Sequence, residues 1–463
     1  MEEARAVVST LDTTIDGKRV KRGILSWTFA CLVLFFVVYC ARPEDIFRFN
    51  GIPIAKIAAI LAIGSFALAV LTGPNVLRVS REMWYLVLLV IWLGIGIPFS
   101  PIWKGGALQA TLEFSKIVPI TFLIGIAVNT QERLKRLMFV QTASVMMVLL
   151  LTLAKVGNHA TADDRLTGVV GGDYGNPNDL AFALVLVVPF CALFILNTRN
   201  IFKKLLWTAT ASLMIYGVLL TYSRAGLLAL MMAGAIILWK FGIKERRFGS
   251  VFFAGILGIS VFLFAGPQGY FRRVQTIVDP NVDFKSDKGS WVARQGELIR
   301  SLEITAEHPI FGVGTGNFIV TSPDWHVTHN AYTELSADGG IPALCFYLLV
   351  LWATFANLKD ALRLSKEKPE IRYLSGALLA SFGAFLVGSF FCSVSYNFFS
   401  YFLVGYAGAL IQIARAGASA EPEIVSPGER LADINSPMPD RLEGEQHARI
   451  GGVPGYQSSK YNR

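Results

Sequence analysis

The chain of 463 residues has few charged side chains and few cysteines. Asp, Glu, Lys and Arg make up only 16% of it, whereas ordinary soluble proteins contain about 25%. This scarcity and a mean hydropathy of +0.51 exclude an ordinary soluble protein. The five cysteines lie in or at the ends of apolar runs and lack metal-ligand spacing, so we expect neither disulfides nor a cysteine metal site. The sequence also has no internal repeat, which argues against a repeat architecture.

What the chain has instead is a series of apolar runs, most of them about 18 residues or longer, which is enough to cross a ~30 Å hydrocarbon core as a helix. Backbone groups inside lipid must be paired within the protein, so these runs are expected to form packed helices. We therefore predict an all-α integral membrane protein with about 12 transmembrane helices. The predicted spans are 24–41, 52–73, 83–103, 113–130, 137–155, 178–197, 205–222, 225–241, 249–266, 338–358, 372–391 and 396–414.

The net charge of +9 comes from basic residues that occupy every second loop. Lys and Arg gather before the first predicted span and after the second, fourth, sixth, eighth and tenth. Cytoplasmic loops carry such an excess, so both termini are predicted to be cytoplasmic and the loop at 267–337 to face outward. Because topology accounts for the charge, it does not indicate a nucleic-acid partner. The first run is too long for a signal peptide and no cleavage pattern follows it, so we expect an uncleaved anchor.

These assignments divide the chain into five parts. The tail, rich in Pro, Ser, Gly and acidic residues, has the composition of a disordered segment. The predicted parts are a cytoplasmic segment 1–23, transmembrane helices one to nine at 24–266, the long periplasmic loop 267–337, transmembrane helices ten to twelve at 338–414, and a disordered cytoplasmic tail 415–463.

The long outer loop concentrates the polar residues of the chain. Trp291 to Glu307 has helical spacing, and His308-Pro309 ends that helix. The glycine-rich turn GVGTGNF follows. It lacks the preceding strand of a nucleotide-binding motif, so it is interpreted as a tight turn that brings backbone close to a ligand or a neighbouring helix. A second short helix is predicted to begin near Asn330 and to lead into the tenth span.

Three arginines are candidate anion ligands. Arg224, in TYSRAG, falls between two apolar runs, and an arginine within a span costs about 2.5–3.5 kcal/mol at mid-helix and less near the ends. Such a residue faces a polar cavity or a ligand, or else extends to lipid headgroups. Arg294 and Arg300 lie on the outer-loop helix, and arginine suits bidentate hydrogen bonding to phosphate. Their six-residue spacing places them poorly on one helical face, so we expect only one of them in the site and favour Arg294, with Arg300 as a possible secondary residue.

His329 is the candidate general base, because histidine accepts a proton near neutral pH and this one lies where the polar loop re-enters the membrane. The other histidines are interpreted as polar surface. Asn330 and Glu334 follow closely in HNAYTEL. A smaller polar stretch, RLTGVVGGDYGNPND, contributes Arg165 and Asn178 as possible secondary site residues, although Asn178 and Asp179 also fit a helix cap.

Together these motifs resemble the O-antigen ligase and polymerase superfamily of bacterial envelope glycan assembly. The matching elements are GNPNDLA at 175–181, TYSRAG at 221–226, Arg294 fifteen residues before the proline of HPIFGVGTGNF, and THNAYTELSADGGIP at 328–342. The resemblance covers roughly 165–345. The chain departs from the family at Asp338, where glutamate is usual, at Ala343, where glycine often follows, and at Leu298, where tryptophan is common.

The resemblance implies a GT-C-like, metal-independent, inverting glycosyltransferase in the bacterial inner membrane. Its donor would be a glycan on undecaprenyl pyrophosphate, and its acceptor a sugar hydroxyl on lipid A–core or on another lipid-linked glycan. Arg224 and Arg294 would bind the pyrophosphate, His329 would take the acceptor proton, and Glu334 would orient His329. No cofactor is implied. The pair Glu44-Asp45 in the first outer loop is interpreted as a solvated pair rather than a cation site, since two arginines already supply positive charge.

Three alternatives remain open on the sequence alone. Within the superfamily, an O-antigen or exopolysaccharide polymerase and a protein O-oligosaccharyltransferase share these motifs. A secondary transporter with 12 helices is the alternative from a different class. Transporters place ionisable residues near the bilayer midplane, whereas the polar residues here gather at one face. A structural scaffold would explain neither Arg224 nor HNAYTEL.

Overall fold

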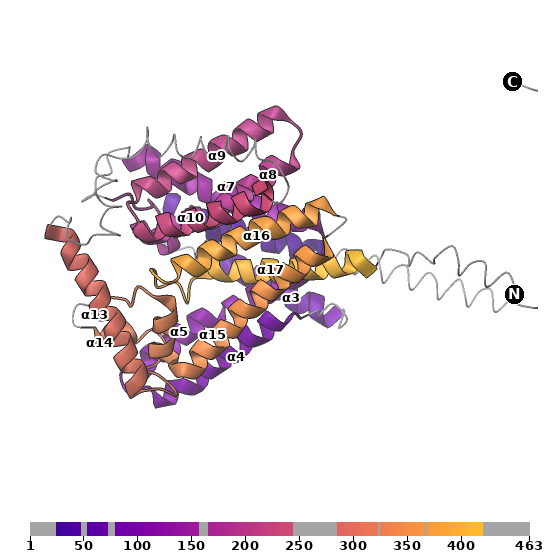
Figure 1. Ribbon diagram of the computed structural model, residues 1–463. Helices are drawn as coiled ribbons and strands as arrows, with labels where there is room; N and C mark the ends of the chain where they lie inside the picture. The colour runs from indigo at the N-terminus through magenta and orange to yellow at the C-terminus, as the bar shows by residue number, and fades with distance from the viewer. Residues whose placement is uncertain are drawn as a thin grey trace, which may run out of the picture. The chain divides into compact units, whose positions relative to one another are not determined.

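The computed structural model describes residues 25–47, 53–72, 79–156, 165–243, 285–322, 325–365 and 368–419. The described helices up to Ala418 belong to one compact unit (Figure 1). In the described ranges the structure is helical and contains no strand. The prediction of an all-α integral membrane protein is therefore confirmed.

The helices follow one another closely along the chain. After the apolar helix Leu25–Ala41 come α2 (Pro43–Ile46), α3 (Ile54–Thr72), α4 (Arg81–Gly96), η2 (Ile97–Phe99), α5 (Lys104–Ser115), α6 (Ile117–Ala127) and α7 (Gln131–Val156). Then follow η3 (Gly172–Tyr174), α8 (Pro177–Asn197), α9 (Ile201–Leu220), α10 (Arg224–Ile237) and η4 (Leu238–Ile243). The last group is α13 (Lys285–Glu307), α14 (Phe318–Thr321), α15 (Ala331–Leu364), α16 (Pro369–Gly388) and α17 (Phe398–Ser419).

Nine helices within the described residues are long and apolar enough to cross a membrane. The first predicted span corresponds to the shorter apolar helix Leu25–Ala41, and the seventh to α9, which is not among the nine. The ninth predicted span, 249–266, lies outside the described residues, as does almost all of the predicted tail 415–463. The count of about twelve therefore stays a prediction.

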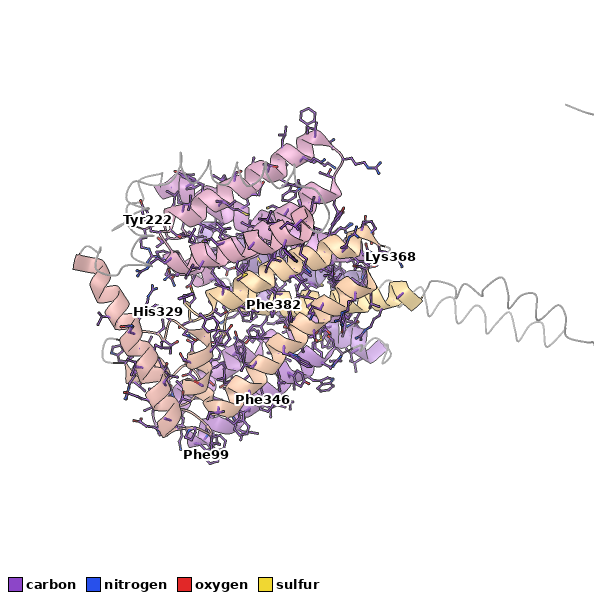
Figure 2. The ribbon with its side chains drawn as sticks, viewed as in Figure 1. Phe99, Tyr222, His329, Phe346, Lys368 and Phe382 are labelled. Atoms are coloured by element: carbon purple, nitrogen blue, oxygen red, sulfur yellow. The ribbon has the colours of Figure 1, made fainter. Side chains whose placement is uncertain are left out.

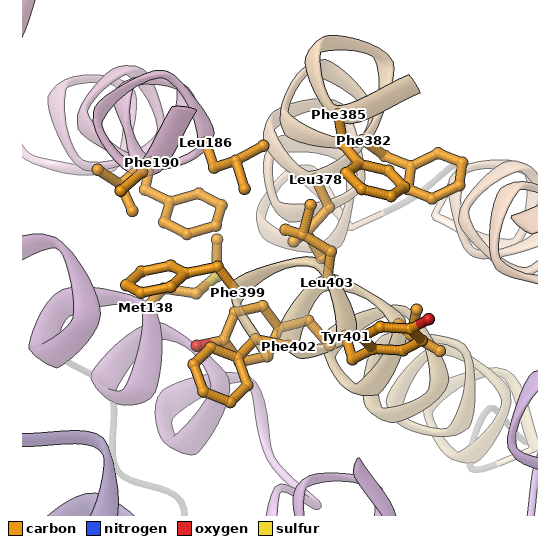
Figure 3. Packing of buried hydrophobic residues seen from close by; sticks show 14 of the residues in the cluster. Met138, Leu186, Phe190, Leu378, Phe382, Phe385, Phe399, Tyr401, Phe402 and Leu403 are labelled. Atoms are coloured by element: carbon orange, nitrogen blue, oxygen red, sulfur yellow. The ribbon is translucent and has the colours of Figure 1, made fainter. Parts of the chain in front are cut away.

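Helices α8, α16 and α17 form the interior of the bundle, because most of their side chains are buried whichever way they point. A helix that is apolar on all sides is stable only when other helices surround it. Phe190 of α8, Phe382 and Phe385 of α16 and Phe402 of α17 all belong to this buried core (Figure 3). By contrast, α3 and α4 leave many large apolar side chains exposed, which is what a lipid-facing helix requires.

The polar loop and the basic loop before α16 lie at opposite ends of the helices. Lys368 precedes α16, and Ser389 follows its 20 residues, a rise of about 30 Å at 1.5 Å per residue. The carbonyl of Ser389 accepts a hydrogen bond of 2.8 Å from the N–H of Ala331, the first residue of α15. His329 therefore lies at the end far from Lys368 (Figure 2). The arrangement agrees with the alternation of basic loops in the sequence.

Candidate functional site

Arg224 is the first residue of α10, at the end of a tight turn from α9. The turn residue Tyr222 has φ 48°, and Ser223 caps the helix with its side chain. Ser223 Oγ also donates to Asn178 Oδ1 at 2.9 Å. Arg165 donates from Nη2 to the same oxygen at 2.9 Å and from Nε to the carbonyl of Thr221 at 2.8 Å. Arg165 and Asn178 thus hold the turn that presents Arg224.

At the start of α8 the sequence left open whether Asn178 caps the helix or belongs to the site, and the structure distinguishes the two. Asn176 is the helix cap, and its side chain accepts hydrogen bonds from the N–H groups of Asn178 and Asp179. The Asn178 side chain is instead engaged by Arg165 and Ser223. The expectation that Asn178 or Asp179 caps the helix is therefore wrong, because the capping geometry belongs to the residue two positions earlier.

Arg294 and Arg300 occupy different surroundings on α13. Arg294 is half-buried and lines a cavity, whereas Arg300 forms an exposed ion pair with Glu303 at 3.5 Å. Helix α13 is fixed to α15 by a hydrogen bond of 2.8 Å between the hydroxyls of Thr305 and Ser336. The six-residue separation rotates the two arginines to different sides of the helix, so only Arg294 faces the site.

His329 lies immediately before α15 in a left-handed conformation, with φ 54°. An L-residue rarely adopts this conformation unless its surroundings hold it there, and such positions concentrate at functional sites. The N–H of His329 donates to Ser393 Oγ at 3.0 Å. Asn330 then caps α15 by accepting from the N–H groups of Tyr332 and Thr333 at 2.9 and 3.1 Å. This confirms the predicted helix start near Asn330.

One cavity of about 280 Å³ brings together four of the residues singled out in the sequence. Arg224 comes from α10, Arg294 from α13, and His329 and Asn330 from the segment before α15. The remaining lining residues are Ala225, Leu228, Gln295, Leu298, Thr328, Phe390 and Phe391. Arg165, Asn178, Arg300 and Glu334 are not among them.

The cavity has strong positive character. It combines two guanidinium groups with the first turns of α10 and α15, whose N-termini carry partial positive charge and N–H groups. Burial, and after it the neighbouring Arg294 and His326, together lower the pKa of His329 to about 4. The imidazole is therefore neutral at pH 7 and available to accept a proton.

The Glu334 carboxylate contacts serines of the loop between α16 and α17. Its carboxylate accepts a hydrogen bond from Ser395, and Ser393 is a second hydroxyl beside it. The family resemblance implied that Glu334, about one helical turn beyond His329, would orient it. In the structure the carboxylate points to the loop between α16 and α17, where Ser393 also accepts a hydrogen bond from the His329 backbone.

The glycine-rich turn packs against α15 and lies outside the cavity. The N–H groups of Gly316 and Phe318 donate to the Asp338 carboxylate, at 2.8 and 3.1 Å. Gly312 has φ 63°, and a Cβ there would lie 2.4 Å from the Ala337 carbonyl oxygen. Gly340, at the kink in α15, has φ 76°, and a Cβ there would lie 2.1 Å from the Ile310 oxygen. Of the two interpretations offered for this turn, close approach to a neighbouring helix is confirmed.

The loop 389–397 between α16 and α17 carries functional contacts that the sequence reasoning missed. Ser393 holds His329, Ser395 bonds to Glu334, and Tyr396 donates to Asp338 at 3.0 Å. Asn397 donates to Asp173 at 3.0 Å, which joins the loop to the segment before α8. The only signal was Ser393 and Ser395 between two predicted spans, since Tyr396 and Asn397 fell inside the predicted span 396–414. They carry no charge, so nothing distinguished them from an ordinary connection.

In the pair Glu44-Asp45, Asp45 is engaged within the protein. Asp45 forms an ion pair of 2.6 Å with Arg42 and accepts a hydrogen bond of 2.9 Å from the N–H of Gly171. Within the described residues, no group of three or more His, Cys, Asp and Glu side chains is arranged to hold a metal ion. Asp45 therefore serves to connect the first outer loop to the segment before α8.

Comparison with known proteins gives one family match. Residues 209–348, which include Arg224, Arg294 and His329, match the family model described as O-antigen ligase. The comparison with curated proteins finds no match. A solved structure described as "Structural coordination of polymerization and crosslinking by a peptidoglycan synthase complex" is 17% identical, over 73% of this chain and 98% of that chain. Its TM-score of 0.39 supports no conclusion.

The fold and the cavity define an all-α integral membrane protein with a cationic pocket at one end of its helices. The family match over residues 209–348 then confirms the resemblance to the O-antigen ligase superfamily that the motifs indicated. This family supports a membrane glycosyltransferase-like role in glycan assembly.

Proposed function

We propose that the protein transfers a glycan from undecaprenyl pyrophosphate to an acceptor sugar hydroxyl at the outer face of the bacterial inner membrane. The observation that carries this proposal is the meeting of Arg224, Arg294 and His329 in one cavity. Two arginines suit a pyrophosphate that gains negative charge as it leaves, and a neutral imidazole suits removal of a hydroxyl proton. The N- and C-termini would both be cytoplasmic.

The proposed step is a single inverting displacement. The acceptor oxygen attacks the anomeric carbon, and the bond from that carbon to the pyrophosphate oxygen breaks with its electron pair going to the pyrophosphate. Arg224 and Arg294 stabilise the departing anion, an electrostatic contribution that is often the largest in catalysis. The proton of the acceptor hydroxyl passes to His329. Arg165 and Asn178 act indirectly, since they hold the turn before Arg224.

The position of the site favours this reaction over transport. Arg224 begins α10, and His329 precedes α15, so both lie at helix ends. Secondary transporters generally bind substrate near the bilayer midplane, at interruptions within helices. A cavity at the helix ends is better suited to two substrates that meet at the membrane surface.

The test is transfer by the purified full-length protein in lipid vesicles without an ion gradient. We expect an undecaprenyl-pyrophosphate-linked glycan to be joined to lipid A–core if the protein is a ligase, and to a second lipid-linked glycan if it is a polymerase. A lipopolysaccharide gel of a deletion strain separates the same cases. Loss of all capped core indicates a ligase, and loss of long chains with single repeats retained indicates a polymerase. Absence of transfer to either acceptor contradicts the proposal.

We further expect transfer to be independent of divalent cations, because the arginines supply the positive charge that Mg²⁺ supplies in other enzymes. Activity should be unchanged after treatment with EDTA, measured as glycan transferred per minute with and without added Mg²⁺ or Mn²⁺. An absolute requirement for a cation, together with loss of the cation-dependent activity in Glu44→Ala or Asp45→Ala, would assign a metal site to the first outer loop instead.

A further inference from the structure

Two phenylalanines form part of the cavity wall although nothing in the proposed step uses them. Phe390 and Phe391 follow α16 directly and line the same cavity as Arg294 and His329. They are 56% and 40% exposed. Large apolar groups left open inside a pocket usually contact a ligand.

The pair is held firmly in place. The N–H groups of Phe390 and Phe391 donate to the carbonyls of Val387 and Gly388 at 3.2 and 2.9 Å, which continues the last turn of α16. The ring of Tyr332 packs against Phe390, with 4.5 Å between ring centroids. Ser389, the residue before the pair, is bonded to the first residue of α15. The Phe390 ring and the Phe391 backbone are therefore held beside the segment that carries His329.

The geometry of the proposed displacement indicates which part of the donor would lie against Phe390 and Phe391. Inversion requires the acceptor oxygen to attack the anomeric carbon from the side opposite the pyrophosphate. The transferred sugar ring therefore lies between the two arginines and His329. The prenyl chain leaves from the far phosphate, away from the base. A wall attached to the segment of His329 faces the sugar.

We propose that Phe390 and Phe391 form the platform that receives the ring of the transferred sugar. The inference rests on the proposed function and specifies its substrate contact. The face of an aromatic ring is electron-rich, and the C–H groups on one face of a pyranose are weakly positive and apolar, so the two surfaces complement each other. Sugar hydroxyls at the ring edge can bond to Gln295, which lines the same cavity.

The first experiment compares ring-preserving with volume-preserving substitutions. Replacing each phenylalanine by Tyr keeps the aromatic face, whereas Phe390→Leu and Phe391→Leu keep only apolar bulk. We expect the double Leu variant to lose roughly tenfold in kcat/KM, and the Tyr variants to remain close to the unaltered protein. Phe355→Leu is the matched control, because Phe355 is 42% exposed and lies on α15 outside the cavity.

Changing the length of the donor's prenyl chain tests whether Phe390 and Phe391 contact the sugar or the lipid. The same glycan is supplied on undecaprenyl pyrophosphate and on a short-chain prenyl pyrophosphate, and we expect the loss in the Leu variants to be equal for both. Full activity of the Leu variants, or a loss that disappears with the short-chain donor, overturns the inference. If the double variant fails to reach normal membrane levels, the single Leu variants give the same comparison.

A binding measurement separates this inference from the proposed function. In saturation-transfer NMR with the free glycan and the full-length protein in detergent, ring-proton signals should appear with the unaltered protein and the Tyr variants. They should be lost with the Leu variants. Equal signals from Leu and Tyr variants overturn the platform. Lack of transfer by the unaltered protein, with these binding differences intact, overturns the proposed reaction instead.

Discussion

Replacing His329 by alanine is expected to lower glycan transfer by about 10²–10⁴-fold, the usual contribution of a general base. The imidazole lines the cavity with Arg224 and Arg294, and no other imidazole among the described residues does so. Donor binding should stay close to normal, because the arginines are unchanged. The measurement is the initial rate of transfer at saturating donor, with protein levels in the membrane checked by immunoblot.

His326→Ala is the matched control for this change. His326 is exposed and three residues away, and its ring does not line the cavity. Its removal should change the rate only slightly. Near-normal transfer by His329→Ala at normal membrane levels would remove the general base from the mechanism.

The pH dependence of the transfer rate is a second test of His329 as the general base. Its pKa lies at about 4 in the free protein, lowered by burial and by the charge of Arg294. The base form is therefore present at neutral pH and is lost as the pH falls through about 4, where kcat/KM should decline. A bound pyrophosphate offsets the Arg294 charge and favours the protonated ring, so the decline in kcat should occur at a higher pH. Both declines should be absent in His329→Ala.

The second large effect is expected from Arg224→Lys, which keeps the charge but loses the planar pair of donors. If Arg224 binds pyrophosphate in a bidentate way, transfer should fall by about 10²-fold, comparable to the loss of one donor to a developing anion. Arg294→Lys should behave in the same way, because both guanidinium groups line the cavity. Transfer and donor affinity are measured together.

Arg300→Lys is the control for the arginine series. Arg300 lies on the same helix as Arg294 but forms an exposed ion pair with Glu303, so lysine should serve equally well. If Arg224 instead only contacts lipid headgroups, Arg224→Lys should also be nearly normal. That result, with normal membrane levels, would remove Arg224 from the pyrophosphate site.

The sequence by itself determined the features that depend on neighbouring residues. Apolar runs gave the all-α membrane fold, because lipid leaves the backbone few other ways to pair its polar groups. The cost of an arginine within apolar surroundings pointed to Arg224, which lines the cavity. The six-residue spacing of Arg294 and Arg300 predicted that one would face away, and the helix start near Asn330 followed from local pattern.

Only the tertiary structure decided which side chains meet across the bundle. Ser393 reaches the backbone of His329 across 64 residues of sequence, and Ser395 reaches Glu334 across 61. These contacts depend on how α15 packs beside α16 and on where the loop 389–397 ends. Periodicity and spacing report the face and ends of one helix, whereas contacts between distant segments are set by packing. The sequence therefore located the arginines and the histidine, and the fold alone assembled their cavity.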